Sequence, residues 1–427
     1  MIKTNCVFIR IICGFFVLSS AIARADTQHH ARAQQPSYKL GIENSNDPVW
    51  QKLFGGGNSQ QAIGLVTNQT GQDQQGRRTV DILLQRGLCV KRIFAPEHGV
   101  LGVVDAAHEV GDTVDHVTKI PVVSLYGHGT GRKIAPHTIK DLDVLIFDMQ
   151  DSGMRHYTYI STLLHVMEAA AHHQKPIVIL DRPNPLGAHI DGPISGKHTK
   201  SFIAIAPMPL RHGMTIGELA HYFNNHVLEQ KAMLHVVSMQ DYKRTMGLPG
   251  KLAAPLSPNI PNKRACYGYS FLGLLGEVRP FDTGLGTPKA MQCLALSEKL
   301  NVAPHLWQQL HANLKKCNIN STAYSYMSPR KNQQCHGLLF SVADINKVAS
   351  FDIMVMVLKF FHDNGVHLTF SKSFDTAVGS HKVHDYVKGR ITRQELVDEV
   401  NTQLTLWQQE VIGSYLYQPL PYVAVMR

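Results

Sequence analysis

Four carboxylate side chains stand just after three short apolar runs of the chain. Glu97 follows the first run, Asp148 and Asp151 follow the second, and Asp181 follows the third. Cleavage of a glycosidic bond needs one carboxyl group to protonate the leaving oxygen and another to stabilise or trap the oxocarbenium-like centre. A carboxyl group that is partly shielded from water keeps its proton more readily and can act as a general acid near neutral pH. We predict that Glu97, held between a nearby proline and glycine, is the general acid/base, and that Asp148, Asp151 and Asp181 compete for the second role.

Polar side chains that could bind a sugar lie close to these carboxylates in the sequence. Arginine, asparagine and tyrosine side chains bind hydroxyl and acidic groups, and a ligand site with few but well-placed polar groups is expected at such a place. Plainer interpretations exist: Asp148 or Asp151 could cap the following helix, and Glu97 could belong to a surface loop. The predicted binding residues are His98, Gln150, Arg155, Tyr157, Tyr159, Arg182 and Asn184.

Several other chemistries have no motif in the chain. Gly-x-Ser-x-Gly, His-Glu-x-x-His, Cys-x-x-Cys and Gly-x-Gly-x-x-Gly followed by an acidic residue are all absent. Residues 127–133 resemble a phosphate-binding loop, but Ile134 stands where a serine or threonine would follow the lysine, so we predict a flexible loop. The 24 histidines leave a metal possible. We nevertheless expect neither a metal nor a cofactor, with a metal-dependent amidase or deacetylase as the weakest alternative.

The apolar runs predict the elements that must position these residues. Short buried runs separated by helical segments are typical of a parallel sheet with right-handed crossovers, and ligands gather at the carboxyl ends of such strands. The fold class is therefore α/β, a Rossmann-like parallel-sheet domain with a second, smaller α+β domain. The predicted strands are 62–67, 89–94, 122–125, 144–147, 177–180 and, in the second domain, 338–342; the predicted helices are 79–86, 160–171, 215–223, 351–364 and 392–407.

Length and composition divide the chain further. A chain of 427 residues exceeds what one hydrophobic core usually supports, so two domains are expected. The predicted segments are a signal peptide over 1–25, a flexible leader over 26–39, a Rossmann-like catalytic domain over 40–254 and an auxiliary α+β domain over 255–427. The formal net charge of +10 favours acidic polymers, but no run of basic and aromatic residues suggests nucleic acid. The oligomeric state cannot be predicted.

The first 25 residues predict export. Lys3 and Arg10 precede a short apolar run, and Ala23-Arg-Ala25 supplies the small residues that a signal peptidase accepts. No later run is long enough to cross a membrane. The predicted cleavage point has no cysteine, so we do not expect a lipid anchor. The mature protein should therefore be periplasmic or secreted, without a stable membrane anchor. Among its five cysteines, Cys317 and Cys335 could pair, and Cys89 should be a small core residue.

Seven ordered motifs resemble those of the NamZ-type exo-β-N-acetylmuramidases. The likeness runs from about Gly41 to the carboxyl end, where residues 374–379 also fit. The motifs are Asn68-Gln-Thr-Gly71, Phe94-Ala-Pro-Glu-His-Gly99, Ser124-Leu-Tyr-Gly127, Phe147-Asp-Met-Gln-Asp151 with Arg155-His-Tyr-Thr-Tyr-Ile-Ser-Thr162, Leu180-Asp-Arg-Pro-Asn-Pro185, Asp191-Gly-Pro193 and Arg211-His-Gly-Met-Thr215.

The resemblance implies an activity and further site residues. It implies exo-cleavage of non-reducing terminal, β-1,4-linked N-acetylmuramic acid from peptidoglycan fragments during wall turnover and recycling, with muropeptides or MurNAc-GlcNAc disaccharides as partners. Glu97 occupies the family's glutamate position, and the sugar's own acetamido group could be the nucleophile. Arg155, Arg182 or Arg211 could hold the lactyl carboxylate. The same motifs add Asn68, Arg211 and His212 to the binding residues.

One region departs from the family pattern. Leu285 stands where relatives often have an arginine, and Glu277 with Arg279 could replace the missing charges. The departure at Leu285 affects the expected details of the substrate more than the expected class of reaction. The alternative from another class is a non-catalytic cell-wall sugar-binding protein that uses the same site without turnover.

Overall fold

The computed structural model describes residues 38–55, 60–105, 108, 111–126, 132–246, 248, 252 and 254–419, without the side chain of Lys197. The predicted signal peptide, most of the leader and the loop over 127–131 lie outside the described residues. The described chain begins at Tyr38, whose side chain is buried, and Lys39 pairs with Gln240. The last two residues of the predicted leader thus belong to the folded part.

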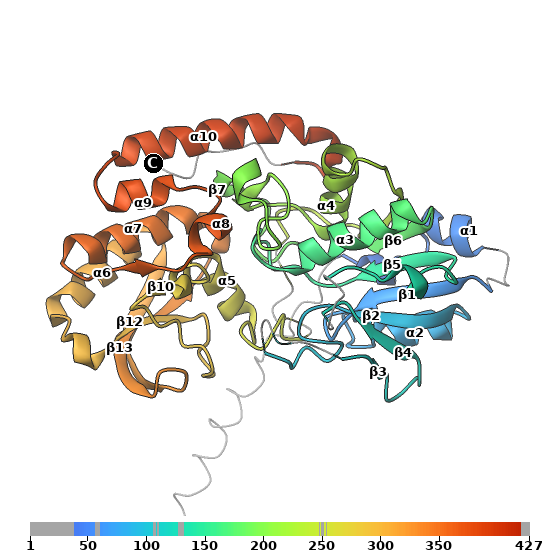
Figure 1. Cartoon of the computed structure of the whole chain (residues 1–427), viewed down its shortest axis with the longest axis horizontal. Helices are drawn as coiled ribbons and strands as arrows, with labels where there is room; N and C mark the ends of the chain where they lie inside the picture. Colours follow the sequence, from blue (N-terminus) through green and yellow to red (C-terminus); the bar gives the residue numbers. More distant parts are fainter. Residues whose placement is uncertain are drawn as a thin grey trace, which may run out of the picture. The chain divides into compact units, whose positions relative to one another are not determined.

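A seven-stranded sheet forms the centre of the first half of the chain (Figure 1). Its order is β3-β4-β2-β1-β5-β6-β9, and every neighbouring pair is parallel except the edge pair of β3 and β4. The strands are β1 (Ala62–Thr67), β2 (Cys89–Ala95), β3 (Thr113–Val114), β4 (Pro121–Ser124), β5 (Val144–Asp148), β6 (Pro176–Leu180) and β9 (Met233–Val237).

Both faces of the central strands β1, β5 and β6 are buried, which explains their unbroken apolar runs. In β5, Val144 and Ile146 belong to one hydrophobic cluster, whereas Leu145 and Phe147 belong to the other, because successive side chains of a strand point to opposite faces. One cluster includes side chains of α1 (Pro48–Phe54) and α2 (Thr79–Gln85). The other includes those of α3 (Tyr159–His172) and α4 (Ile216–Tyr222).

The second half of the chain contains a smaller antiparallel sheet with helices. Its strands run in the order β11-β13-β12, and β10 pairs with β14 beside it. The elements are α5 (Lys263–Leu272), β10 (Val278–Arg279), β11 (Cys293–Ser297), α6 (Pro304–Lys316), β12 (Ile319–Ser328), β13 (Gln333–Val342), α7 (Ser350–Asp363), β14 (Thr369–Phe370), α8 (Phe374–Val378), α9 (Lys382–Val387) and α10 (Arg393–Glu410). The fold class is therefore as predicted, a parallel-sheet α/β domain with a smaller α+β domain, while the boundary at 254 stays a prediction.

Most predicted elements lie within two residues of the observed bounds. Both predicted capping boxes are present, from Thr215 to Glu218 and from Thr392 to Glu395. Among the predicted elements, the largest difference is in β13, which begins at Gln333 rather than at 338. Several observed elements have no counterpart among the predictions, including the helices α1, α5, α6, α8 and α9 and the strands β9, β11 and β12. β9 is an edge strand of the sheet, and its first four residues are exposed or only partly buried.

The cysteine predictions are wrong. Cys89 is exposed, because it is the first residue of β2 and lies before the part of the strand that the helices cover. Cys317 and Cys335 are both free thiols. Cys335 lies buried inside β13, whereas Cys317 follows the end of α6.

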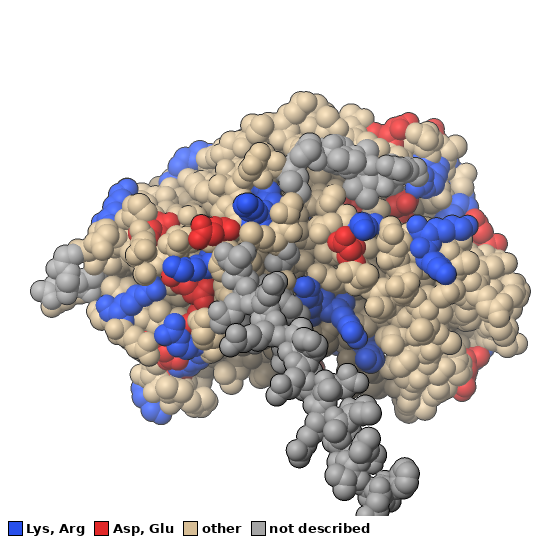
Figure 2. Space-filling model, turned by 180° about the vertical axis from the view of Figure 1, so that it is seen from behind, with Lys and Arg blue, Asp and Glu red and all other residues tan. Residues whose placement is uncertain are grey.

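Two surface properties bear on partners. No helix within the described ranges is long and apolar enough to cross a membrane. On the face shown in Figure 2, basic and acidic side chains are interspersed rather than gathered into one basic patch. The net positive charge is thus spread over this face.

Candidate active site

Glu97 lies in a tight turn directly after β2. Its side chain is buried, and the Thr158 hydroxyl donates a hydrogen bond of 2.6 Å to its Oε2. The next residue, His98, has φ +71°, which non-glycine residues rarely adopt, and its Nδ1 lies 2.6 Å from the carbonyl oxygen of Val104. This contact ties the turn to the following loop. The turn therefore holds the Glu97 carboxyl group at the carboxyl edge of the sheet.

Two tyrosines that we did not predict lie beside Glu97. Burial raises the pKa of Tyr126 above its usual range, and the charge of Glu97 raises it further. Burial also raises the pKa of Tyr269, and the negative charges of Glu97 and Asp151 raise it further. The two carboxylates therefore lie near a shared tyrosine. Tyr126 follows the end of β4, so it could have been predicted from the rule that ligands gather at the carboxyl ends of parallel strands. Tyr269 belongs to α5, and no pattern in the neighbouring sequence indicates that it lies near Glu97.

Asp151 has one oxygen in use and one without a partner. Its Oδ2 accepts hydrogen bonds from the Gly153 backbone N–H at 2.6 Å and from His212 Nε2 at 3.0 Å. The Met214 N–H donates to His212 Nδ1 at 3.2 Å, so a neutral His212 carries its proton on Nε2 and donates it to Asp151. Asp151 Oδ1 is buried and has no hydrogen-bond partner. A buried acceptor of this kind is costly unless a ligand or water pairs with it.

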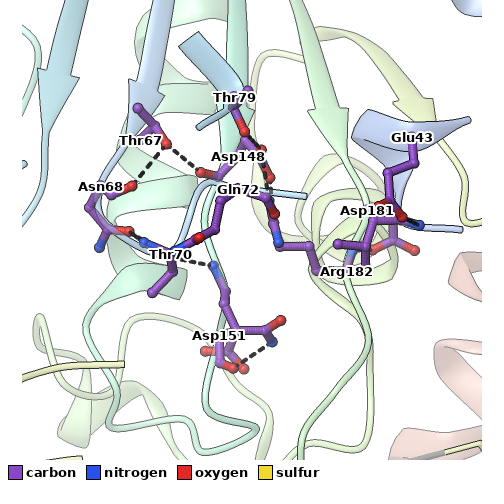
Figure 3. Close-up of polar contacts among 12 residues, drawn as sticks. Glu43, Thr67, Asn68, Thr70, Gln72, Thr79, Asp148, Asp151, Asp181 and Arg182 are labelled. Carbon is purple, nitrogen blue, oxygen red and sulfur yellow. Dashed lines mark hydrogen bonds and ion pairs between the residues drawn. The ribbon is translucent and has the colours of Figure 1, made fainter. Parts of the chain in front are cut away.

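Asp148 is fully engaged in a buried ion pair. Arg182 Nε lies 2.5 Å from its Oδ1 and Arg182 Nη2 lies 2.9 Å from its Oδ2. The Thr79 hydroxyl also donates to Oδ2, so both oxygens are occupied. Figure 3 shows this carboxylate between Thr79 and Arg182, with Asp151 on the other side of the Asn68 to Thr70 turn. Asp148 therefore joins β5 to α2 and to the segment after β6.

Both carboxylate oxygens of Asp181 also accept hydrogen bonds from protein groups, mainly from residues around the start of α4. Its Oδ1 accepts hydrogen bonds from the backbone N–H groups of Arg182 at 2.9 Å and Gly217 at 2.8 Å. The hydroxyls of Thr215 and Tyr417 donate to Oδ2 at 3.0 and 2.6 Å. Burial raises the pKa of Asp181 to about 7 in spite of these bonds. The side chain thus anchors α4 and the carboxyl-terminal segment.

The raised pKa of Asp181 predicts how stability changes with pH. An unfolded aspartate loses its proton near pH ~3.9, whereas the folded protein keeps it up to about pH 7. The unfolded state therefore binds fewer protons between these values, and the free energy of unfolding should fall as the pH rises through this window. Asp181→Asn should lose less stability than the wild type between pH 5 and pH 7 in urea denaturation. Burial raises the pKa of Asp191 to about 6, but that effect is shared by both proteins. Parallel pH profiles would contradict the assignment.

Arg155 and Arg211 are buried and point their guanidinium groups at backbone carbonyls. Arg155 donates to the carbonyls of residues 193, 208, 377 and 378 at 2.5 to 2.9 Å. Arg211 donates to those of residues 186, 345 and 348. Burial lowers the pKa of Arg155 to about 9 and that of Arg211 to about 10. Both arginines therefore tie the first half of the chain to the second, whereas Arg182 uses Nε and Nη2 to pair with Asp148.

The turn after β1 contributes buried polar atoms near Glu97. Asn68 Oδ1 accepts hydrogen bonds from the backbone N–H and the hydroxyl of Thr70, whereas Asn68 Nδ2 has no partner. Gln69 Oε1 is also without a partner. Tyr159 lies close enough to Asn68, Gln69 and Glu97 for each to influence its pKa, which burial raises above the usual range. Unpaired donors and acceptors around Glu97 are the groups that a polar ligand would satisfy.

The remaining predicted residues have mainly positioning contacts. Tyr157 donates its hydroxyl to the Leu256 carbonyl at 2.7 Å, and Tyr159 to the same atom at 3.2 Å. Gln150 Nε2 donates to the carbonyls of Asp151 and Pro183, and Asn184 closes the turn at residues 184–186. Glu277 is exposed and accepts hydrogen bonds from the hydroxyls of Ser371 and Ser373. In the described part of the chain, no group of three or more His, Cys, Asp and Glu side chains could hold a metal ion.

Comparison with known proteins gives consistent matches over most of the chain. Residues 63–264 match the family model described as "Exo-beta-N-acetylmuramidase NamZ, N-terminal", and residues 267–417 match its C-terminal counterpart. The chain is 33% identical over 424 residues to "Peptidoglycan beta-N-acetylmuramidase NamZ" of Bacillus subtilis (strain 168), covering 95% of this chain and 97% of that protein.

Two crystal structures of DUF1343 family proteins from Bacteroides fragilis NCTC 9343 have the same fold. One has a TM-score of 0.78 at 30% identity, covering 90% of this chain and 100% of that chain. The other has a TM-score of 0.69 at 26% identity, covering 90% and 99%. The likeness thus extends through both halves of the described chain.

Proposed function

Because the chain belongs to the NamZ family of exo-β-N-acetylmuramidases, we propose that Glu97 is the general acid/base of its reaction. The protein is an exo-acting glycoside hydrolase of peptidoglycan. The observation that carries the proposal is a buried carboxyl group after β2, bonded to the Thr158 hydroxyl and surrounded by Tyr126, Tyr269 and unpaired polar atoms. A carboxyl group within hydrogen-bond reach of the glycosidic oxygen can donate a proton to it as the bond breaks.

The proposed substrates are muropeptides and MurNAc-GlcNAc disaccharides with N-acetylmuramic acid at the non-reducing end, joined by a β-1,4 bond. Protonation of the glycosidic oxygen by Glu97 would release free N-acetylmuramic acid, and the resulting carboxylate would accept a proton from water in the second half of the reaction. The test is liquid chromatography of the products that purified protein forms from MurNAc-GlcNAc. Release of N-acetylmuramic acid supports the function, and its absence with several muropeptides would reject it.

Asp151 is our choice for the second carboxylate. Asp148 and Asp181 have both oxygens occupied by protein groups, whereas Asp151 Oδ1 has no protein partner. Two N–H donors hold Oδ2, so the carboxylate is oriented without using its other oxygen. That oxygen can face the anomeric centre or accept the N–H of the sugar's acetamido group. Both roles stabilise the positive charge that develops as the bond breaks.

Replacing Asp151 with asparagine should slow turnover of MurNAc-GlcNAc by about 10² to 10⁴-fold, as for other catalytic groups of this kind. The amide keeps the size of the side chain but removes the negative charge. Thermal melting should change little compared with this loss of kcat. A matched control is Asp363→Asn, because Asp363 is exposed at the end of α7 and pairs with Lys359 there. Activity of Asp151→Asn within threefold of that control would exclude the assignment.

Export is also part of the proposal. It is supported by the basic residues, apolar run and Ala23-Arg-Ala25 of the amino terminus. A periplasmic or secreted enzyme would meet peptidoglycan fragments where they are released. Mass spectrometry of the protein from its native host should find a mature chain beginning near Asp26. A chain that begins at Met1 would exclude cleavage.

A further inference from the structure

A pocket of about 740 Å³ lies in the second half of the chain, between α6 and the β11-β13-β12 sheet. Its lining residues fall between positions 296 and 338, inside the segment that matches the C-terminal family model. The lining includes neither Glu97 and Asp151 nor any of the side chains described around them. The pocket is therefore separate in composition from the candidate active site, and the function proposed above leaves it unused.

The pocket combines an accessible indole with polar groups. Trp307 on α6 is only partly buried, and its ring is held edge-on against Phe361 at a centroid distance of 5.4 Å. By contrast, Trp50 and Trp407 are buried. The lining contains apolar side chains such as Val302 and Leu338, together with hydroxyl and amide side chains from Ser297, Thr322, Ser325, Asn301 and Gln308. An aromatic ring offers the apolar face of a sugar a flat surface, and the surrounding donors and acceptors suit its hydroxyl and acetamido groups.

Two histidines in the pocket are oriented by the sheet. His311 Nδ1 lies 2.8 Å from the Ser321 hydroxyl, and His336 Nδ1 lies 2.7 Å from the Ser325 hydroxyl. Ser325 and His336 are cross-strand partners of β12 and β13, so their positions follow from the register of the sheet. The binding surface is thus built on regular elements rather than on a loop.

The charged side chains of the lining limit the ligands that this pocket could bind. No lysine or arginine lines the pocket, and its one carboxylate, Glu298, lies 3.7 Å from His336. A phosphate-rich polymer would need cationic partners, which this surface does not supply. The lining instead fits the uncharged parts of a sugar chain, because its apolar side chains, among them Val302, Pro304 and Leu338, can cover ring faces while its hydroxyl and amide groups pair with hydroxyl and acetamido groups.

We propose that this pocket is a second glycan-binding site, which takes β-1,4-linked N-acetylhexosamine units of a peptidoglycan strand or fragment. The choice of this sugar class rests on the proposed function, because the enzyme then acts on chains of such sugars. Its volume lies within the range of about 300 to 1,000 Å³ typical of small-molecule sites. The site would keep a long fragment close to the enzyme between successive cleavages.

The test uses the full-length protein and chitotetraose, which has no muramic acid to cleave. We expect a saturable change in tryptophan fluorescence, because Trp307 is the accessible indole. Isothermal titration should show affinity about tenfold weaker in Trp307→Ala, a loss of ~1.4 kcal/mol. Gln308→Ala should weaken binding too, while His305→Ala, an exposed residue of the same helix outside the pocket lining, should bind as the wild type does.

Separate outcomes distinguish this inference from the enzymatic proposal. Turnover of MurNAc-GlcNAc should stay within twofold of the wild type in Gln308→Ala. No saturable binding of chitotetraose, or affinity unchanged in both Trp307→Ala and Gln308→Ala, would overturn the second site. Binding that depends on these residues in a protein that releases no N-acetylmuramic acid would support the site and reject the enzymatic function.

Discussion

Glu97→Gln should abolish most muramidase activity while the protein stays folded. General acid catalysis contributes about 10² to 10⁴ in rate, and the amide cannot protonate the glycosidic oxygen. We therefore expect kcat for para-nitrophenyl β-N-acetylmuramide, and for MurNAc-GlcNAc, to fall by about this factor. The substitution keeps the shape of the side chain and its contact with Thr158, so the melting temperature should change little. The disaccharide should show the larger loss, because its leaving group depends more on protonation.

A matched glutamate provides the control for this experiment. Glu168 is exposed on α3 and lies 3.6 Å from Lys133, so Glu168→Gln should retain full activity. Turnover by Glu97→Gln equal to that of the control would reject Glu97 as the acid. If neither the wild type nor the variant cleaves muramides, and both bind muropeptides alike, the protein would be a wall-sugar-binding protein without turnover.

Asp148→Ala should cause the largest loss of stability among the predicted site residues. The substitution leaves the Arg182 guanidinium buried without its carboxylate, and removing one member of a buried ion pair typically costs about 3 to 5 kcal/mol. It also leaves the Thr79 hydroxyl without its acceptor. We expect a lower midpoint of urea denaturation, and low yields of soluble protein at 37 °C.

The double variant Asp148→Ala/Arg182→Met separates charge burial from packing. Replacing both members removes the uncompensated charge, so the double variant should be more stable than Asp148→Ala alone. Asp148→Asn offers a milder single substitution if the alanine variant cannot be purified. If Asp148→Ala and Asp148→Asn each lower the free energy of unfolding by less than about 1 kcal/mol, the ion pair contributes little to stability, as exposed ion pairs do.

The Glu97, Asp151 and Asp148 variants distinguish a catalytic role from a structural role for carboxylates that follow strands of the same sheet. Asp148, Asp151 and Asp181 all follow the carboxyl ends of parallel strands, where ligands usually bind. In the structure, Asp148 bonds to Arg182 and Asp181 to the start of α4, so both support the architecture. Activity should therefore depend directly on Glu97 and Asp151, and stability on Asp148.

Local patterns in the sequence determined most of the first half of the fold. Strands buried on both faces are typically unbroken apolar runs, so β1, β5 and β6 could be predicted nearly to the residue. The two capping boxes likewise need residues only three positions apart. The same locality placed Glu97 and the elbow after β5 at one edge of the sheet. The ordered motifs also identified the family.

Only the tertiary structure decided which polar side chains are available to a ligand. Hydrogen bonds from Arg182 to Asp148, from Tyr417 to Asp181 and from Arg155 to residues 377 and 378 join positions 34 to 236 residues apart, so no local pattern reveals them. Tyr269 likewise reaches the surroundings of Glu97 and Asp151 from α5. The residue type determines which donors and acceptors a side chain has. Whether a ligand can pair with them depends on which distant groups of the chain already do so in the folded protein.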